Sequence, residues 1–174
     1  MKNIVLIGFM GSGKTVIATR LSKILGRQII DTDKIIERKK RIKIKNIFKL
    51  YGEEYFRKLE SDAVRFVGKQ KGKIISTGGG VVTKSHNIKE LKKNGIIVYL
   101  KNKFATSVNR LKNKKDRPLF NVADIKRTRK LFNQRLKLYK KAADIIVETD
   151  NKTIGEVAKE IIKRSWKYTK CLQK

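Results

Sequence analysis

The chain has 174 residues and carries 45 Lys and Arg against 15 Asp and Glu, which gives a net charge of +30 at pH 7. This length is typical of one well-buried domain, and we expect residues 1–174 to form a single domain. One cysteine, Cys171, and one histidine, His86, exclude a disulfide framework and a Cys/His metal cluster. No apolar run reaches the length of a signal-peptide core or a membrane-spanning helix, so we expect a cytoplasmic protein.

The positive charge admits two interpretations. One is a surface for nucleic acid, which predicts an affinity that falls steeply with salt. The other is a lysine-rich composition without a special role. The basic residues are dispersed from Lys2 to Lys174 and are not interleaved with aromatic residues, which favours the second interpretation. We therefore expect no specific nucleic-acid partner. We also expect no membrane attachment and a monomer.

In chain order, the first informative stretch is the octapeptide GFMGSGKT at residues 8–15, which has the spacing G-x-x-x-x-G-K-[ST]. It lies between an apolar run and a helical pattern, the context that a phosphate-binding loop needs. Its glycines allow backbone N–H groups to converge on an anion, and the positive end of the following helix faces the same point. Lys14 supplies an ammonium group for the phosphates and Thr15 a hydroxyl ligand for Mg²⁺. The stretch predicts binding of a nucleoside triphosphate.

Apolar runs alternate with helical patterns along the whole chain. The runs that we expect to be strands are Ile4–Ile7, Gln28–Asp31, Ile74–Thr77, Ile96–Leu100 and Ile145–Val147. This alternation predicts a parallel sheet with helices on both faces, and mostly apolar runs are typical of strands buried on both sides. In such sheets ligands bind beyond the carboxyl ends of the strands. The residues that follow each run are therefore the candidates for a site.

The second run ends in Asp31-Thr32-Asp33. Two carboxylates two residues apart point the same way if the strand geometry continues, so one can face a metal ion and the other an acceptor. The alternative is that Asp33 caps the helix that follows. A pair of carboxylates beyond a phosphate loop favours the functional role.

Arg57 and Glu60 are three residues apart in a helical pattern, and this spacing alone indicates an exposed surface pair. The third run is followed by Gly78-Gly79-Gly80. Three glycines cost conformational entropy and add no packing. A close approach of the backbone to a ligand explains them, and a simple tight turn is the alternative.

The segment from Arg110 to Leu119 is charged, has no periodicity and contains the only proline of the chain. These features are typical of a mobile lid over a phosphate site. The segment also spells N-K-x-D at residues 113–116, a pattern that reads guanine in small GTPases. That pattern should directly follow a buried strand, and here the strand ends at Leu100. No Asp of the chain has a Gly three residues later, so we do not favour a GTPase.

Taken together, six separated pieces of the chain resemble the shikimate kinase family, from Asn3 to about Arg164. The pieces are GFMGSGKT at 8–15, DTD at 31–33, Phe56-Arg57-x-x-Glu60, STGGG at 76–80, Arg117-Pro118-Leu119 and Arg135-x-x-Leu138-Tyr139. The phosphate loop is shared by many families, but the ordered set is specific.

The resemblance implies the three-layer α/β/α fold of the nucleoside monophosphate kinases, with a five-stranded parallel sheet. It also implies a substrate-binding helical region at about 32–60 and a lid at about 111–123. The implied activity is the ATP- and Mg²⁺-dependent phosphorylation of the 3-hydroxyl of shikimate, which gives shikimate 3-phosphate and ADP on the route to chorismate and the aromatic amino acids.

The resemblance also implies how the acceptor is held. The acceptor-binding residues it implies are Asp33, Arg57, Glu60, Gly78, Gly79, Gly80 and Arg135. Arg57 and Arg135 would bind the shikimate carboxylate, a task that suits planar guanidinium groups. Glu60 would orient Arg57, and the glycines would hold the substrate through backbone amides. Asp33 would hold ring hydroxyls and align the attacking one, with its role as a base left open.

For the nucleotide, the residues that the resemblance implies are Gly11, Ser12, Gly13, Lys14, Thr15, Val16, Arg110, Arg117 and Lys152. Thr15 would bind Mg²⁺ directly and Asp31 through water. Lys14 and Arg117 would supply positive charge around the transferred phosphoryl group, and with Asp33 they form the implied catalytic set. Arg110 and the loop near Lys152 would flank the adenine. Val16 departs from the family, which often has Thr there.

Another small-molecule kinase of the same fold, such as a gluconate or nucleotide kinase, is the alternative within this class. The pair Arg57 and Arg135 favours a carboxylate on the acceptor, and the Asp-Thr-Asp segment favours a polyol. Shikimate has both groups and fits best.

Overall fold

A computed structural model of the chain describes residues 1–112 and 124–171. In chain order the elements are β1 (Asn3–Ile7), α1 (Lys14–Leu25), β2 (Ile29–Asp31), α2 (Thr32–Lys40), α3 (Ile44–Gly68), β3 (Ile74–Ser76), α4 (Ser85–Asn94), β4 (Gly95–Lys101), α5 (Phe104–Leu111), α6 (Ile125–Ala142), β5 (Ile145–Glu148) and α7 (Ile154–Cys171). All five expected strands are present, each with bounds within one residue of the expected ones. The alternation of apolar runs and helical patterns therefore predicted the elements correctly.

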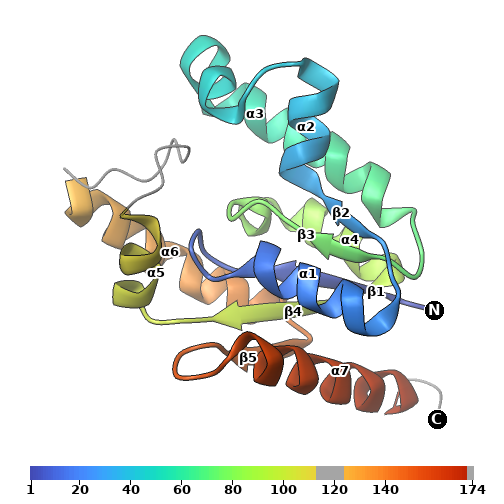
Figure 1. Cartoon of the computed structure of the whole chain (residues 1–174). Coiled ribbons are helices and arrows are strands. Elements are labelled where there is room, and N and C mark those ends of the chain that lie inside the picture. Colours follow the sequence, from blue (N-terminus) through green and yellow to red (C-terminus); the bar gives the residue numbers. More distant parts are fainter. Residues whose placement is uncertain (113–123, 172–174) are drawn as a thin grey trace.

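Within the described residues the five strands form one parallel sheet in the order β2-β3-β1-β4-β5. Strand β1 lies in the middle, where Val5 pairs with Ile75 on one side and with Ile97 on the other. The loop that follows β1 consequently leaves from the centre of the carboxyl edge of the sheet, as Figure 1 shows. This is the edge at which open α/β sheets bind ligands.

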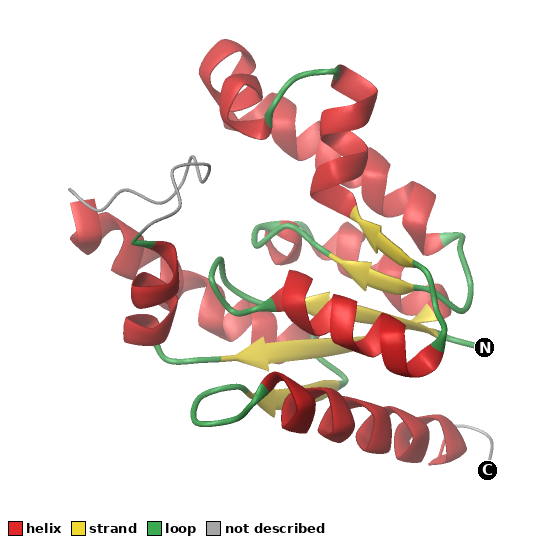
Figure 2. Ribbon diagram, viewed as in Figure 1, coloured by secondary structure: helices red, strands yellow, loops and turns green. Residues whose placement is uncertain are grey.

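Helices cover both faces of the sheet, which gives the expected three-layer α/β/α architecture (Figure 2). One face of the sheet packs against α1 and α7, through a cluster that includes Leu6, Leu21 and Ile161. The opposite face packs against α3, α4 and α6, through a cluster that includes Val64 and Tyr139. Burial on both faces explains why the central strands are apolar throughout.

Helices α2 and α3 extend beyond the sheet and have a small core of their own, formed by Ile36, Ile47, Phe56 and Ala63. Helix α3 is kinked at Gly52, where the backbone has φ 76° and ψ 177°. With α2, the first part of α3 lies beyond β2, on the side of the molecule toward which the strands point (Figure 1).

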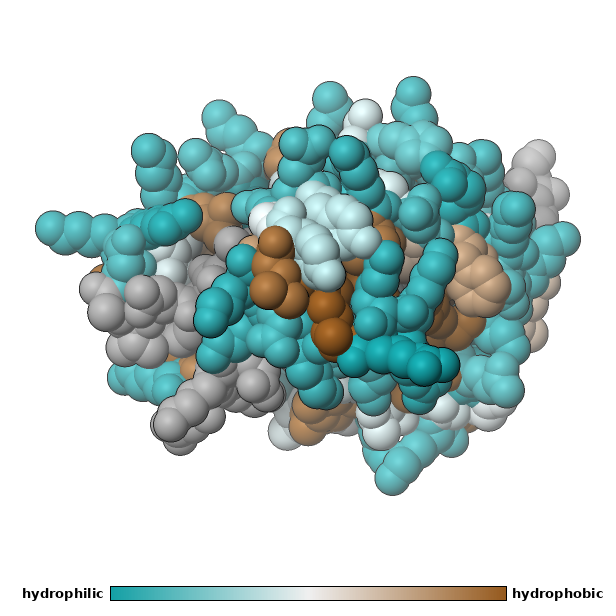
Figure 3. All heavy atoms as spheres, turned by 90° about the horizontal axis from the view of Figure 1, so that it is seen from above, coloured by the Kyte–Doolittle hydropathy of each residue, from teal (hydrophilic) through white to brown (hydrophobic). Residues whose placement is uncertain are grey.

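Hydrophilic side chains cover most of the face shown in Figure 3, with small hydrophobic areas between them. This agrees with basic residues that are dispersed along the chain. Over the described ranges, none of the helices combines the length and the apolar character that crossing a bilayer requires.

Candidate active site

The loop between β1 and α1 has the geometry of a phosphate-binding loop. Helix α1 begins directly after Gly13, whose left-handed backbone (φ 92°) turns the chain into the helix. The Lys14 ammonium group donates hydrogen bonds to the carbonyl oxygens of Gly8 at 2.8 Å and Phe9 at 3.0 Å. The ammonium group is thereby held within the loop, and the strand, loop and helix predicted from the octapeptide are confirmed.

A cavity of about 390 Å³ lies above this loop. The expected nucleotide and metal residues that line it are Gly11, Ser12, Gly13, Lys14, Thr15, Val16, Asp31, Arg110 and Lys152. Arg110 reaches the loop itself, because its Nη1 donates to the carbonyl oxygen of Gly11 at 3.3 Å. Lys152 pairs with Glu160 at 2.7 Å. The structure therefore brings nine residues, which the sequence analysis named in four separate segments, to one cavity.

The two aspartates at the junction of β2 and α2 have different tasks. Asp31 is the cap of α2, since its Oδ1 accepts hydrogen bonds from the backbone nitrogens of Asp33 at 2.9 Å and Lys34 at 3.2 Å. The alternative that Asp33 is the capping residue is therefore wrong. Asp33 lies in the first turn of α2, and its carboxylate lies over Gly78, where an added Cβ would come within 2.7 Å of Oδ1. Capping by Asp31 leaves the Asp33 carboxylate to face the cavities.

A second, smaller cavity of about 60 Å³ adjoins the first. Its lining is formed by Met10, Asp33, Ile44, Phe48, Phe56, Arg57, Glu60, Gly78, Gly79, Gly80 and Arg135. This set contains every residue that the resemblance assigned to the acceptor. Met10, Asp33 and Gly79 line both cavities, so these three residues mark the junction between them.

Arg57 and Glu60 form a buried pair at the far end of the smaller cavity. Their exposed fractions are 7% and 0%, and Arg57 Nη1 lies 2.7 Å from Glu60 Oε2. The interpretation of their spacing as an exposed surface pair is wrong, because the face of α3 that carries both residues packs against the glycine loop. Burial raises the pKa of the Glu60 carboxyl, an effect that Arg57 and Arg135 oppose only in part. For Arg57, burial lowers the pKa, but Glu60 and Glu53 outweigh it and raise the pKa above its ordinary value.

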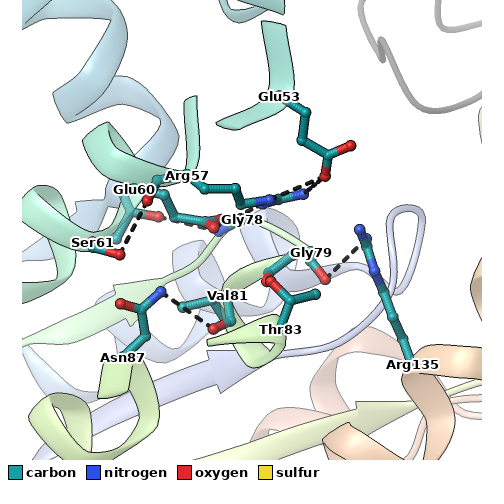
Figure 4. A network of polar contacts seen from close by, with 12 residues as sticks. Glu53, Arg57, Glu60, Ser61, Gly78, Gly79, Val81, Thr83, Asn87 and Arg135 are labelled. Carbon is teal, nitrogen blue, oxygen red and sulfur yellow. Dashed lines mark hydrogen bonds and ion pairs between the residues drawn. The ribbon is translucent and has the colours of Figure 1, made fainter. Parts of the chain in front are cut away.

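The glycine loop after β3 passes directly under these side chains (Figure 4). A Cβ on Gly80 would lie 2.0 Å from Arg57 Nη1, so only glycine leaves room for the guanidinium group. The Gly78 nitrogen donates to Thr32 Oγ1 at 3.1 Å. The Gly79 carbonyl oxygen accepts from Arg135 Nη1 at 3.3 Å and from the Tyr139 hydroxyl at 2.5 Å. Close contacts with the side chains of Asp33, Glu60 and Arg57 therefore account for Gly78 and Gly80, and the loop also makes turn hydrogen bonds from the Val81 nitrogen to the Gly78 carbonyl oxygen and from the Thr83 nitrogen to the Gly80 carbonyl oxygen. The close approach of this loop to a ligand stays a prediction.

Sequence reasoning gave no role to three residues of this site. Thr32 and Tyr139 hold the glycine loop, and Glu53 binds Arg57 through its Oε1, at 3.1 Å from Nε and 2.7 Å from Nη2. The spacing contained a signal for two of them. Tyr139 is four residues after Arg135 and Glu53 is four residues before Arg57, so in each case the two side chains share one face of a helix.

Two buried polar atoms of the smaller cavity have no hydrogen-bond partner within the part of the chain that the structure describes. They are Glu60 Oε1, an acceptor, and Arg135 Nε, a donor. Buried polar groups are normally paired, so such atoms indicate a polar ligand. A small molecule that carries both hydroxyl groups and a carboxylate can satisfy them.

For a metal ion, no group of three or more His, Cys, Asp or Glu side chains gathers anywhere in residues 1–112 and 124–171. Mg²⁺ usually takes one or two protein oxygens together with phosphates and water. Thr15 and Asp31 line the larger cavity and fit this pattern. Arg117 and residues 113–123 of the expected lid lie outside the described residues.

Comparison with known proteins agrees with this geometry. A family model described as shikimate kinase matches residues 10–166. A shikimate kinase of Dehalococcoides mccartyi is 44% identical over 166 residues, which cover 95% of this chain and 94% of that protein. One of Caldanaerobacter subterraneus is 44% identical over 164 residues, with 94% and 95% covered.

Solved structures give the same result. A structure of shikimate kinase from Acinetobacter baumannii in complex with shikimate has a TM-score of 0.91 and 34% identity, and covers 96% of this chain and 94% of that one. A gluconokinase from Sinorhizobium meliloti has a TM-score of 0.62 at 12% identity, covering 99% and 95% of the two chains. The second likeness concerns the fold alone.

Proposed function

The chain belongs to the shikimate kinase family, and we propose that its two adjoining cavities carry out the reaction of that family. This reaction is the ATP-dependent phosphorylation of the 3-hydroxyl of shikimate. The observation that carries the proposal is the junction of the cavities. Asp33 lines both of them, with Lys14 on the nucleotide side and the pair Arg57 and Arg135 on the other. A phosphate donor and a carboxylated acceptor bound in this way would meet head to head at Asp33.

On the acceptor side, Arg57 and Arg135 would bind the shikimate carboxylate. Arg135 supports this role through its buried Nε donor, and Arg57 is oriented from behind by Glu60. Asp33 would then hold the ring hydroxyls and aim the 3-hydroxyl at the γ-phosphorus atom. The new bond joins that oxygen to phosphorus while the bond from phosphorus to the β–γ bridging oxygen breaks, and the hydroxyl proton passes to Asp33 or to solvent. Because the transition state of phosphoryl transfer is loose, positioning matters more than activation of the hydroxyl.

On the nucleotide side, the backbone N–H groups of residues 11–16 and the start of α1 would bind the phosphates. Lys14 would turn its ammonium group from the loop carbonyls to the β- and γ-phosphates. Thr15 and Asp31 would hold Mg²⁺, which would neutralise charge between the phosphates. Arg110 and Lys152 would flank the adenine, and Arg117 would close over the phosphates. We further propose that the chain acts as a cytoplasmic monomer without a nucleic-acid or membrane partner, in keeping with its dispersed basic residues.

The test is shikimate-dependent release of ADP by the purified chain in the presence of Mg²⁺. Gluconate and AMP, offered at the same concentrations, are the acceptors that separate shikimate kinase from other kinases of this fold. We expect turnover with shikimate and none above the background without acceptor for the other two. Equal turnover with gluconate would contradict the assignment of the acceptor.

A further inference from the structure

Glu53 occupies Arg57 on the side of the guanidinium group that Glu60 leaves open. A single oxygen of Glu53 accepts from both Nε at 3.1 Å and Nη2 at 2.7 Å, while Glu60 accepts from Nη1 at 2.7 Å. Figure 4 shows the two carboxylates on opposite sides of the same guanidinium group. Arg57 thus already binds two carboxylates, although the proposed function requires it to bind a third, that of the acceptor.

The charges of the smaller cavity show why this matters. Its lining contains two carboxylates, Asp33 and Glu60, and two guanidinium groups, Arg57 and Arg135, so these four side chains balance. Glu53 adds a further negative charge in direct contact with Arg57. An anionic acceptor that approaches Arg57 therefore meets both an occupied guanidinium edge and a repelling carboxylate within a few ångströms.

The two glutamates differ in how firmly they are held. The side chain of Glu60 is 1% exposed, whereas that of Glu53 is 52% exposed. Glu60 cannot leave Arg57 without stranding a charge in the interior, which is strongly unfavourable. Glu53 can turn into water without losing its solvation, because about half of its side chain is already exposed, and an incoming carboxylate keeps the buried Arg57 paired. Glu53 is the partner that an incoming carboxylate can displace.

We propose that Glu53 is an internal competitor for the carboxylate of the acceptor and thereby sets the affinity of the site. With the site empty, Glu53 neutralises Arg57 and keeps its guanidinium group in place. When the acceptor binds, its carboxylate takes the position of Glu53, which turns toward solvent. When the product leaves, Glu53 returns to Arg57 and speeds release. This inference rests on the proposed function and adds an affinity-determining residue to it.

The test compares Glu53→Gln with Glu54→Gln. The control removes the same charge from the next residue of the same helix, where Glu54 pairs with Lys58 at 3.3 Å and both side chains are largely exposed. Binding of shikimate is measured by calorimetry and by KM in the ADP-release assay. We expect Glu53→Gln to bind shikimate about twofold to fivefold more tightly than the unchanged chain, because one weakly held competing carboxylate is lost. Glu54→Gln should bind shikimate with the affinity of the unchanged chain, and the KM for ATP should be the same in all three proteins.

Unchanged or weaker binding of shikimate by Glu53→Gln would overturn the proposal, and weaker binding would show that Glu53 positions Arg57 as Glu60 does. The methyl ester of shikimate lacks the negative charge, so Glu53→Gln should not bind the ester more tightly than the unchanged chain does. An equal increase in affinity for the ester would also overturn the proposal that Glu53 competes with the carboxylate. Glu53→Ala gives the same comparison if the glutamine variant does not fold. Failure of the unchanged chain to bind shikimate would refute the proposed function itself and is seen before any variant is compared.

Discussion

The two halves of the site are built in different ways. The nucleotide half is centred on one contiguous stretch, residues 11–16 at the start of α1, to which Asp31, Arg110 and Lys152 are added from other segments. In the proposed function this stretch binds the phosphates mainly through backbone N–H groups. The acceptor half is formed by side chains from α2, α3, α6 and the glycine loop, which are far apart in the sequence. A backbone-built half depends on local conformation, whereas a half built from side chains depends on the packing of the whole domain.

The two halves also differ in how deeply their charged side chains are buried. Lys14 is partly exposed and bound by loop carbonyls, whereas Arg57, Glu60 and Arg135 are buried. Buried charges are stable only while their partners remain in place. We therefore expect changes in the nucleotide half to affect catalysis with little effect on folding, and changes in the acceptor half to affect both.

The strongest way to break this comparison is Lys14→Ala, for which we expect turnover to fall by about 10²–10³ or more, as for removal of other groups that stabilise transition-state charge. The temperature of unfolding should hardly change, because Lys14 is partly exposed and its ammonium group binds loop carbonyls near the surface. Rates of ADP release at saturating substrates and circular dichroism on heating measure both effects. Lys23→Ala, in the last turn of the same helix, is the control, and activity of Lys14→Ala within about tenfold of the parent would refute the role of the loop.

On the acceptor side, Arg135→Ala should weaken shikimate binding by about tenfold to a hundredfold, the range for hydrogen bonds to a charged group. The affinity for ATP should stay the same, since Arg135 lines the smaller cavity only. Titration calorimetry with each ligand separates the two effects. Lys137→Ala removes a positive charge from the exposed side of α6 and should change neither affinity. A parallel loss of ATP affinity in Arg135→Ala would count against the division of the site into two halves.

The buried glutamate sharpens the comparison through pH. In the unfolded chain Glu60 has an ordinary pKa near 4.5, and in the fold burial raises that pKa. Between the two values the folded state keeps a proton that the unfolded state has lost. The stabilising contribution of Glu60 is therefore complete below the unfolded pKa and is lost as the pH rises through the folded pKa. The loss is about 1.4 kcal/mol for each pH unit that separates the folded pKa from the unfolded pKa.

Urea unfolding of the unchanged chain and of Glu60→Gln between pH 4 and 7 measures this contribution. We expect the stability of the unchanged chain relative to Glu60→Gln to decrease as the pH rises. An increase over the same range would mean that the attraction of Arg57 outweighs burial at this carboxyl. Lys14→Ala should show the same pH dependence as the unchanged chain, because it leaves Glu60 and its partners intact.

The sequence predicted the nucleotide half more completely than the acceptor half for the same physical reason. A phosphate loop is local, so its spacing contains the strand, the turn and the helix. The pair Arg57 and Glu60 looks like a surface pair until the packing of α3 against the glycine loop is known. Which aspartate caps α2 depends on a shift of two residues in the start of the helix, and Asp31 and Asp33 are equally good caps by residue type. The bond from Tyr139 to Gly79 joins residues 60 positions apart, and local patterns contain no information about it.

Tyr139 offers the smallest and most specific test, because it links the packing of α6 to the junction between the halves. Its hydroxyl donates to the Gly79 carbonyl oxygen at 2.5 Å, and its ring stacks on Tyr99 with ring centres 5.0 Å apart. Burial raises the pKa of both phenols, that of Tyr99 to about 12, so Tyr139 remains a hydrogen-bond donor at any working pH. Tyr139→Phe keeps the stack and removes the contacts of the hydroxyl with the loop and with Arg135, which should lower kcat/KM for shikimate by about threefold to tenfold. Tyr99→Phe removes a hydroxyl from the same aromatic pair and is the matched control.

If Tyr139 only fills the core, both variants will lose stability to the same degree and keep the parental KM for shikimate. If Tyr139 positions the loop, Tyr139→Phe alone will raise the KM for shikimate. The KM for ATP will change less. Gly79 borders both cavities, but in the proposed function the shikimate carboxylate depends on both the loop and Arg135.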